Sequence, residues 1–182
     1  GKNEGVIRLK YSVDIHEMVF PKYAKLQFKV NRAGNLTLIA SPSYTPGKLP
    51  DGLKPGQIPK GTRIFDYDSQ IVVSLTFQDC LNIIEFAKSR NVANTVELFR
   101  NSDKYNKKVT ISYFPDEADA LKPKFVTIWF NSSEASGKEI NFKLPLSLSN
   151  LDEIAELVKS YVHGFVMIKL FCQEQLQEQP QE

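Results

Sequence analysis

The sequence predicts an α+β fold in which a strand-rich block followed by a helix occurs twice. Residues 6–73 read as strands, and a helix opens at Ser74-Leu75-Thr76; residues 95–145 read as strands again, and a second helix opens at Ser147-Leu148-Ser149. The chain has 182 residues, of which 42% are hydrophobic, and this suits one domain with a sizeable core. We therefore expect a single domain over residues 1–172 and a frayed Gln/Glu-rich tail over residues 173–182.

Alternation of apolar and polar residues with a period of two predicts the first strands, over residues 6–13 and 24–31. The residues expected to point inward are Ile7, Leu9, Tyr11, Val13, Leu26, Phe28 and Val30. A turn follows at residues 31–35, where Gly34 supplies a positive φ. Further strands are predicted over residues 36–40 and 63–73.

The segment between the third and fourth strands, residues 42–62, differs in composition from the rest of the chain. Residues 42–61 hold five of the ten prolines and four of the nine glycines, together with three lysines. Proline at this density cannot join a sheet ladder. We expect a mobile, weakly basic loop, because long segments of this kind are usually functional or disordered.

Strands in the second half are predicted over residues 96–99, 107–114, 125–131 and 139–144, with turns at 101–103, 115–116 and 136–137. In the helix that closes the first half, Thr76 is the expected N-cap, and Asp79 completes an imperfect capping box. The apolar stripe of that helix comprises Phe77, Cys80, Leu81, Ile84 and Ala87.

The last helix, over about residues 151–171, is apolar on more than one flank. Its main stripe comprises Leu151, Ile154, Val158, Tyr161, Phe165, Ile168 and Cys172. Additional apolar surface comes from Leu157, Val162, Val166 and Leu170. One sheet face cannot cover so wide a stripe. The pattern favours burial between a sheet and a neighbouring subunit, and the alternative is a fully buried core helix.

Few residues offer catalytic or metal-binding chemistry. His16 is placed in a loop after the first strand and His163 within the last helix, and neither has a cysteine or carboxylate at triad or ligand spacing. The two cysteines, Cys80 and Cys172, form no CxxC motif, and no Gly-rich phosphate loop is present. No apolar run approaches the length of a membrane span. We expect a protein that is not an enzyme, with no cofactor or metal and no membrane partner.

Charge is unevenly distributed along the chain. Residues 151–182 carry two basic and six acidic side chains, although the whole chain has a net charge of +2. A basic body with an acidic C-terminal segment fits the binding of a polyanion by one face. The residues predicted to contact phosphates are Arg8, Lys10, Lys25, Lys29, Arg32, Lys108 and Lys143.

Alternation places few aromatic residues on the outward side of these strands, so stacking platforms for bases are not expected. The predicted binding mode is therefore contact with the phosphate backbone, with little sequence preference. The alternative is a lysine-rich sheet face that is merely solvated.

Two stretches of the chain carry motifs that can be compared with those of known families. The first runs from Tyr11-Ser12-Val13-Asp14 through residues 26–38, where Asn31-Arg32-Ala33-Gly34-Asn35 joins two strands. The second is Phe65-Asp66-Tyr67-Asp68, followed by a strand and a Ser-Leu-Thr helix start. Both stretches resemble the Whirly-fold family of single-strand nucleic-acid-binding proteins, and the order of elements is similar over about residues 5–171. Within the family, the chain most resembles the kinetoplastid mitochondrial branch of guide-RNA-binding proteins.

The resemblance implies two four-stranded antiparallel sheets packed together, each half (ββββα) closing with a helix. It also implies a hetero-tetramer with a related paralogous subunit, assembled through the helices and located in the mitochondrial matrix. The implied function is to bind guide RNA through its phosphates and to promote its annealing to pre-mRNA in RNA editing. Rival functions are single-stranded DNA binding of a nucleoid or transcriptional type, and an oligomeric scaffold without a nucleic-acid role.

Overall fold

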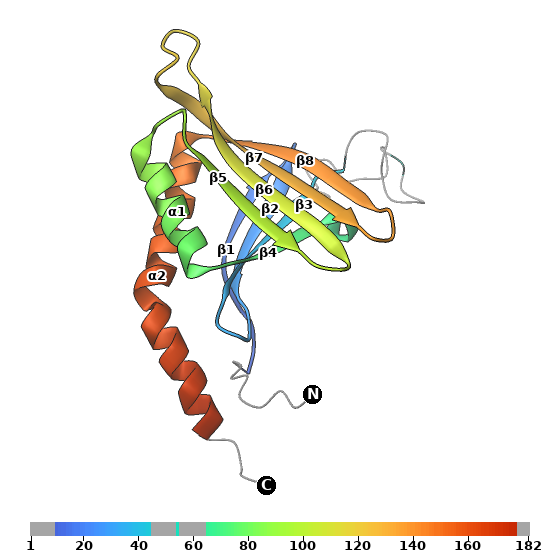
Figure 1. Cartoon of the computed structure of the whole chain (residues 1–182), viewed down its shortest axis with the longest axis vertical. Helices are drawn as coiled ribbons and strands as arrows, with labels where there is room; N and C mark the ends of the chain where they lie inside the picture. The colour runs from blue at the N-terminus through green and yellow to red at the C-terminus, as the bar shows by residue number, and fades with distance from the viewer. Residues whose placement is uncertain (1–9, 45–53, 55–64, 178–182) are drawn as a thin grey trace.

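Eight strands form two antiparallel sheets in the computed structural model, which describes residues 10–44, 54 and 65–177 (Figure 1). Sheet 1 has the order β1-β2-β3-β4 and sheet 2 the order β5-β6-β7-β8. Sheet 1 comprises β1 (Val13–Phe20), β2 (Ala24–Val30), β3 (Leu36–Pro42) and β4 (Ile71–Leu75). Sheet 2 comprises β5 (Thr95–Asn101), β6 (Tyr105–Pro115), β7 (Pro123–Glu134) and β8 (Glu139–Leu146).

One helix follows each sheet, namely α1 (Phe77–Ser89) after sheet 1 and α2 (Leu148–Gln177) after sheet 2. The two helices pack against each other on one side of the crossed sheets (Figure 1). The expected α+β fold with two four-stranded antiparallel sheets, each half closing with a helix, is therefore confirmed.

The first strand was predicted seven residues too early. β1 spans Val13–Phe20, so His16 lies within a strand and pairs with Phe28 instead of occupying a loop. A bulge between Asp14 and His16 interrupts the alternation, and β1 is an edge strand whose Val13 and Ile15 side chains are exposed. Bulges and exposed edge residues both break the period-two pattern. Residues 6–9 lie outside the described part of the chain.

The fourth strand is shorter than predicted, because a turn precedes it. The Asp66 carboxylate accepts hydrogen bonds from the Asp68 amide at 3.1 Å and from the Ser69 hydroxyl at 2.7 Å. These bonds cap a short 3₁₀ helix, η2 (Tyr67–Ser69), and β4 begins only at Ile71. Of the predicted mobile loop, residues 45–53 and 55–62 lie outside the described residues.

Helix α1 begins where the sequence predicted. The Thr76 hydroxyl accepts from the Asp79 amide at 3.0 Å, and the Asp79 carboxylate accepts from the Thr76 amide at 2.9 Å, so the capping box is complete. The predicted apolar stripe is partly wrong. The buried side chains are Cys80, Ile83, Phe86 and Ala87, whereas Phe77 and Leu81 are partly exposed.

The inner faces of the two sheets share one hydrophobic core with the helices. Phe28 and Phe130 are its largest fully buried side chains. Polar contacts also tie sheet 2 to the β4 edge of sheet 1. Arg100 donates to the Ser74 carbonyl at 2.8 Å and pairs with Asp79, and the Lys107 ammonium donates to the Val72 carbonyl at 3.0 Å. These contacts fix the relative placement of the two sheets.

Helix α2 is longer than the predicted 151–171 and has two different halves. Leu151, Ile154, Val158 and Tyr161 are buried, and the Tyr161 hydroxyl donates to the Gly34 carbonyl at 2.8 Å. Leu157 and Val162, which the sequence suggested were surplus to the core, pack partly against it. The second half extends beyond the sheets (Figure 1). Its exposed apolar side chains are Val166, Met167, Leu170 and Phe171.

Candidate nucleic-acid interface

The predicted phosphate-binding residues fall on two separate surfaces. Lys25 and Lys29 of β2 lie on the outer face of sheet 1, opposite the buried Leu26 and Phe28. Lys108 of β6 and Lys143 of β8 lie on the outer face of sheet 2. Their outward placement, which was inferred from alternation, is confirmed.

The remaining predicted contacts do not lie in strands of the described structure. Lys10 precedes β1 and its ammonium lies 5.5 Å from the centre of the Tyr11 ring. Arg32 is exposed in the turn between β2 and β3. Arg8 lies outside the described residues. The prediction that Lys10 lies on a strand face is therefore wrong, because β1 begins only at Val13, whereas the outward strand positions of the other four lysines are correct.

On sheet 1, polar neighbours hold each lysine side chain in place. The Lys25 ammonium lies 3.5 Å from the Glu17 carboxylate and donates to the Tyr67 hydroxyl at 3.3 Å. Burial acts to lower the pKa of Lys25, but the hydrogen bond to Tyr67 and the charge of Glu17 outweigh it, so the pKa is raised. Lys29 lies 3.3 Å from Asp14. The raised pKa keeps Lys25 cationic at neutral pH, and each of the two lysines has a carboxylate close by.

Each of these ion pairs slightly reduces the affinity of its lysine for a phosphate, because the phosphate must displace the carboxylate. On sheet 2, Lys108 similarly lies 3.4 Å from Glu97. Exposed pairs of this kind contribute only about 0–1 kcal/mol, so a phosphate can displace the carboxylate at small cost. Lys143 differs, because it forms no ion pair within the described part of the chain. Of the four lysines on the strand faces, we infer that Lys143 is the one most available to an incoming phosphate.

The outer face of sheet 2 also presents aromatic side chains that the sequence did not reveal. Phe99 is 51% exposed and Trp129 is 40% exposed. The expectation of few outward aromatics is therefore wrong. Trp129 was concealed because residues 128–130, Ile-Trp-Phe, are all apolar, so inward and outward positions look alike there.

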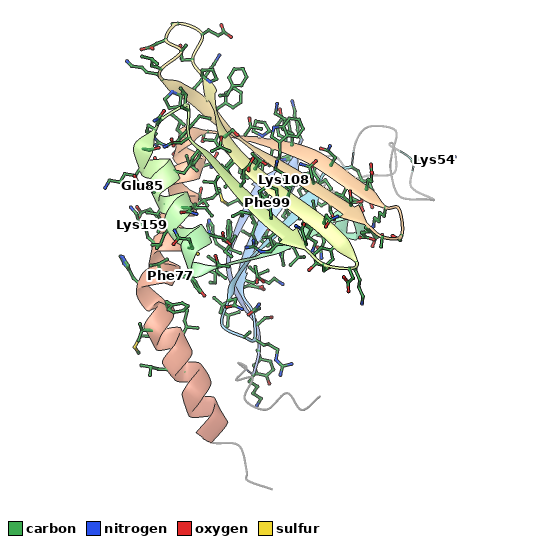
Figure 2. The ribbon with its side chains drawn as sticks, in the orientation of Figure 1. Lys54, Phe77, Glu85, Phe99, Lys108 and Lys159 are labelled. Atoms are coloured by element: carbon green, nitrogen blue, oxygen red, sulfur yellow. The ribbon has the colours of Figure 1, made fainter. Side chains whose placement is uncertain are left out.

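Each of these aromatics stands beside a lysine on the neighbouring strand. Phe99 is directly opposite Lys108, whose ammonium lies 5.1 Å from the ring centre; Figure 2 shows the two side by side on β5 and β6. Trp129 is directly opposite Lys143, also at 5.1 Å. A ring next to a cation can stack on a base while the cation binds the adjacent phosphate. The two lysine–aromatic pairs, Phe99–Lys108 and Trp129–Lys143, therefore suit a single-stranded nucleic acid.

The titratable residues of the described part show no arrangement that would hold a metal. No group of three or more His, Cys, Asp or Glu side chains lies within reach of one ion there. His16 contacts Glu153 at 2.7 Å, linking β1 to α2, and His163 is exposed on α2. Among the described helices, none combines the length and the apolar character needed to cross a membrane.

Cys80 is expected to be inert in the folded protein. It is fully buried on α1, and burial raises its pKa from 9.0 to about 11, with the Asp79 charge adding to the effect. At pH 8 roughly one Cys80 in a thousand would then be the reactive thiolate. In a Cys172→Ser variant, a thiol reagent at pH 8 should leave the native protein unlabelled and label it fully after denaturation. Rapid labelling of the native variant would contradict this placement of Cys80.

The crossed sheets and their two helices define a Whirly-like α+β fold. The crystal structure of WHY1 from Arabidopsis thaliana is similar to this chain with a TM-score of 0.60 and 14% sequence identity, covering 95% of this chain and 97% of that one. The structure of a guide-RNA-binding protein complex bound to a gRNA is similar with a TM-score of 0.49 and 13% identity, covering 85% and 91%. No protein-family model and no curated protein matches the sequence. The Whirly-like fold expected from the sequence is confirmed.

Proposed function

We propose that this chain is a non-catalytic RNA-binding protein that holds single-stranded guide RNA and promotes its annealing to pre-mRNA in RNA editing. The observation that carries the proposal is the pair of cross-strand lysine–aromatic contacts on the outer face of sheet 2. The guide-RNA assignment, and with it the mitochondrial matrix, rests on the resemblance of residues 11–14, 26–38 and 65–68 described above.

The two sheets would divide the work of binding. On the outer face of sheet 1, Lys25 and Lys29 lie in strands whose described outward positions carry no aromatic residue. Tyr67, which precedes β4, is 53% exposed and its ring centre lies 5.4 Å from the Lys25 ammonium, so one base can stack there while the lysines bind phosphates and the other bases stay free. On sheet 2, Phe99 and Trp129 would anchor bases, while Lys108 and Lys143 bind phosphates. An anchored strand with part of its bases free can pair with a complement. Lysines also reduce the repulsion between the two like-charged strands.

Assembly would join several such surfaces. The four exposed apolar side chains of α2, namely Val166, Met167, Leu170 and Phe171, need a cover that the described chain does not supply. We propose that a related subunit covers them and that the complex is a hetero-tetramer. Linked sites raise affinity through effective concentration without any new contact.

Single-stranded DNA is the second candidate ligand. Phosphate contacts and base stacking engage groups that DNA and RNA share, so the lysine–aromatic pairs suit either strand. Competition between strands of the same sequence separates the two candidates. A third candidate is an oligomeric scaffold, and it predicts no binding to either strand.

Gel-shift titration over a salt series, together with a fluorescence assay for annealing of complementary RNA strands, tests the proposal. We expect RNA affinity to fall steeply as salt rises, because counterions are released on binding. We also expect faster annealing when protein is present. Affinity that does not depend on salt would overturn the phosphate-binding mechanism, and tighter binding to DNA would favour the second candidate.

A further inference from the structure

A hollow of about 550 Å³ lies on sheet 2 beside the Phe99–Lys108 pair. Its walls include the amide side chains of four asparagines, Asn101, Asn106, Asn131 and Asn141, which come from all four strands of the sheet. Two rows of the sheet register meet there. Each row consists of one residue from each strand, paired with its neighbour on the next strand. From β5 to β8, the first row is Phe99, Lys108, Asn131 and Asn141, and the second row is Asn101, Asn106, Ser133 and Glu139. A ring, a cation and several amides are thus gathered at one place.

These four amides have no hydrogen-bonding role within the described protein. None of the side-chain hydrogen bonds found among the described residues involves Asn101, Asn106, Asn131 or Asn141. The asparagines of the turns behave differently; for example, the Asn31 side chain accepts from the amides of Ala33 and Asn35. Asn131 and Asn141 lie inside β7 and β8, where asparagine is disfavoured, whereas Asn101 ends β5 and Asn106 lies near the start of β6. The amides around the hollow are therefore available to a ligand.

The chemistry of the walls selects the kind of ligand. A stacked base needs a ring face, which Phe99 offers at 51% exposure, and a neighbouring cation for its phosphate, which Lys108 offers. Glu139 at the far end of the hollow would repel a phosphate but can accept a hydrogen bond from an exocyclic amino group. The base should therefore lie over the amides, with its phosphate on the Lys108 side.

We propose that this hollow is a subsite for one unpaired purine base, with adenine preferred. An asparagine amide offers a donor next to an acceptor, and that pair matches the N6/N7 edge of adenine, whereas the O6/N7 edge of guanine presents two acceptors. A purine also stacks over more of the Phe99 ring than a pyrimidine does. The proposal rests on the proposed nucleic-acid function and goes beyond it, because it adds a preference for one base to a surface otherwise expected to stack on any base.

The test uses short oligouridylates that differ at one central position, which carries adenosine, guanosine, uridine or an abasic site. The only tryptophan, Trp129, is a neighbour of Asn131 on the same face of β7, so quenching of its fluorescence reports a base on this surface. We expect the adenosine strand to bind at least about thirtyfold more tightly than the abasic strand, which is the lower end of what one well-placed amide pair and one stacked base together contribute. The uridine and guanosine strands should bind with intermediate affinity.

Substitutions in the hollow test whether it is the source of the preference for adenosine. Phe99→Ala should reduce the advantage of the adenosine strand over the abasic one, and Asn131→Ala with Asn141→Ala should remove the preference for adenosine over uridine. Phe114→Ala is the matched control, because Phe114 is an outward phenylalanine of the same sheet, 44% exposed, whose ring is stacked on Phe125 at 4.6 Å. The control should keep the full preference.

The outcomes separate this proposal from the proposed function. Equal affinity for the adenosine and abasic strands, or a preference that survives both the phenylalanine and the asparagine changes, would overturn the base subsite while leaving phosphate binding intact. A guanosine preference would overturn the amide-based selection of adenine. Failure of the unaltered protein to bind any of the strands would overturn the nucleic-acid function itself.

Discussion

Replacing Val166 and Phe171 together by glutamate should convert the assembled protein into monomers and lower its RNA affinity by about a hundredfold or more, the gain that linked sites usually provide. Val166 is 65% exposed and Phe171 is 55% exposed, so the new charges would lie in any interface that covers this end of α2. Burying them there without partners is costly. Sedimentation or light scattering gives the mass of the complex, alone and mixed with a candidate paralogue, and a gel-shift titration gives the affinity.

Substitutions at Val166 and Phe171 should affect assembly without affecting folding. Val162 packs partly against the core, so a charge there would disturb the fold as well as any interface. Val166 and Phe171 are exposed, and exposed substitutions usually change stability by less than about 0.5 kcal/mol. The circular dichroism spectrum should therefore stay unchanged.

Leu121→Glu is the matched control, because Leu121 is 82% exposed in the loop between β6 and β7 and far along the chain from α2. This variant should keep both the oligomer and the affinity. A monomeric Val166→Glu/Phe171→Glu protein with undiminished RNA affinity would show that binding does not depend on assembly.

Local patterns in the sequence were sufficient to predict much of the fold. The alternation in β2, the turn with Gly34 at a φ of 83° and the Thr76–Asp79 capping box are all properties of neighbouring residues, and each was predicted correctly. Thr76 and Asp79 also mark the boundary between the first sheet and its helix. Such short-range chemistry is readable because tertiary contacts do not override it.

Other features depend on contacts between distant segments. The apolar stripe of α1 was predicted incorrectly because α2 covers a second flank of that helix. Phe77 lies on this flank, and its ring centre is 5.3 Å from that of Phe165, so Phe77 is partly covered by α2. Arg100 was not singled out at all, although it joins sheet 2 to Ser74 and Asp79. Neither contact leaves a periodic signal in the sequence.

The candidate site could be predicted only in part, because it too depends on contacts between distant segments. Lysines at outward positions of β2, β6 and β8 follow from alternation, and the structure places them outward. The partners of those lysines could not be predicted, because Glu97, Phe99 and Trp129 become neighbours of Lys108 and Lys143 only through the strand register. Register is a tertiary property that a strand pattern alone does not determine.

Removing Lys143 should weaken RNA binding more than removing Lys29, although both are outward lysines on the face of a sheet. Lys29 and Lys108 must first leave Asp14 and Glu97, whereas Lys143 lies beside the Trp129 ring and forms no ion pair among the described residues. A phosphate that binds Lys143 therefore displaces no carboxylate. We expect the order of affinity loss to be Lys143→Ala first, then Lys108→Ala, then Lys29→Ala.

The double variant Lys108→Ala/Lys143→Ala provides the stronger test. Each lost phosphate contact on a single strand should reduce the slope of log affinity against log salt by about 0.7, and two contacts should cost roughly tenfold in affinity near physiological salt. Lys159→Ala is the control, because Lys159 lies on α2, away from the outer faces of both sheets, and pairs with Glu156 at 3.2 Å (Figure 2). If Lys159→Ala lowers the salt slope as much as the double variant does, the attraction comes from the net charge of the protein, and the outer face of sheet 2 has no special role. If the double variant loses affinity for only some sequences, Lys108 and Lys143 contact bases instead of phosphates.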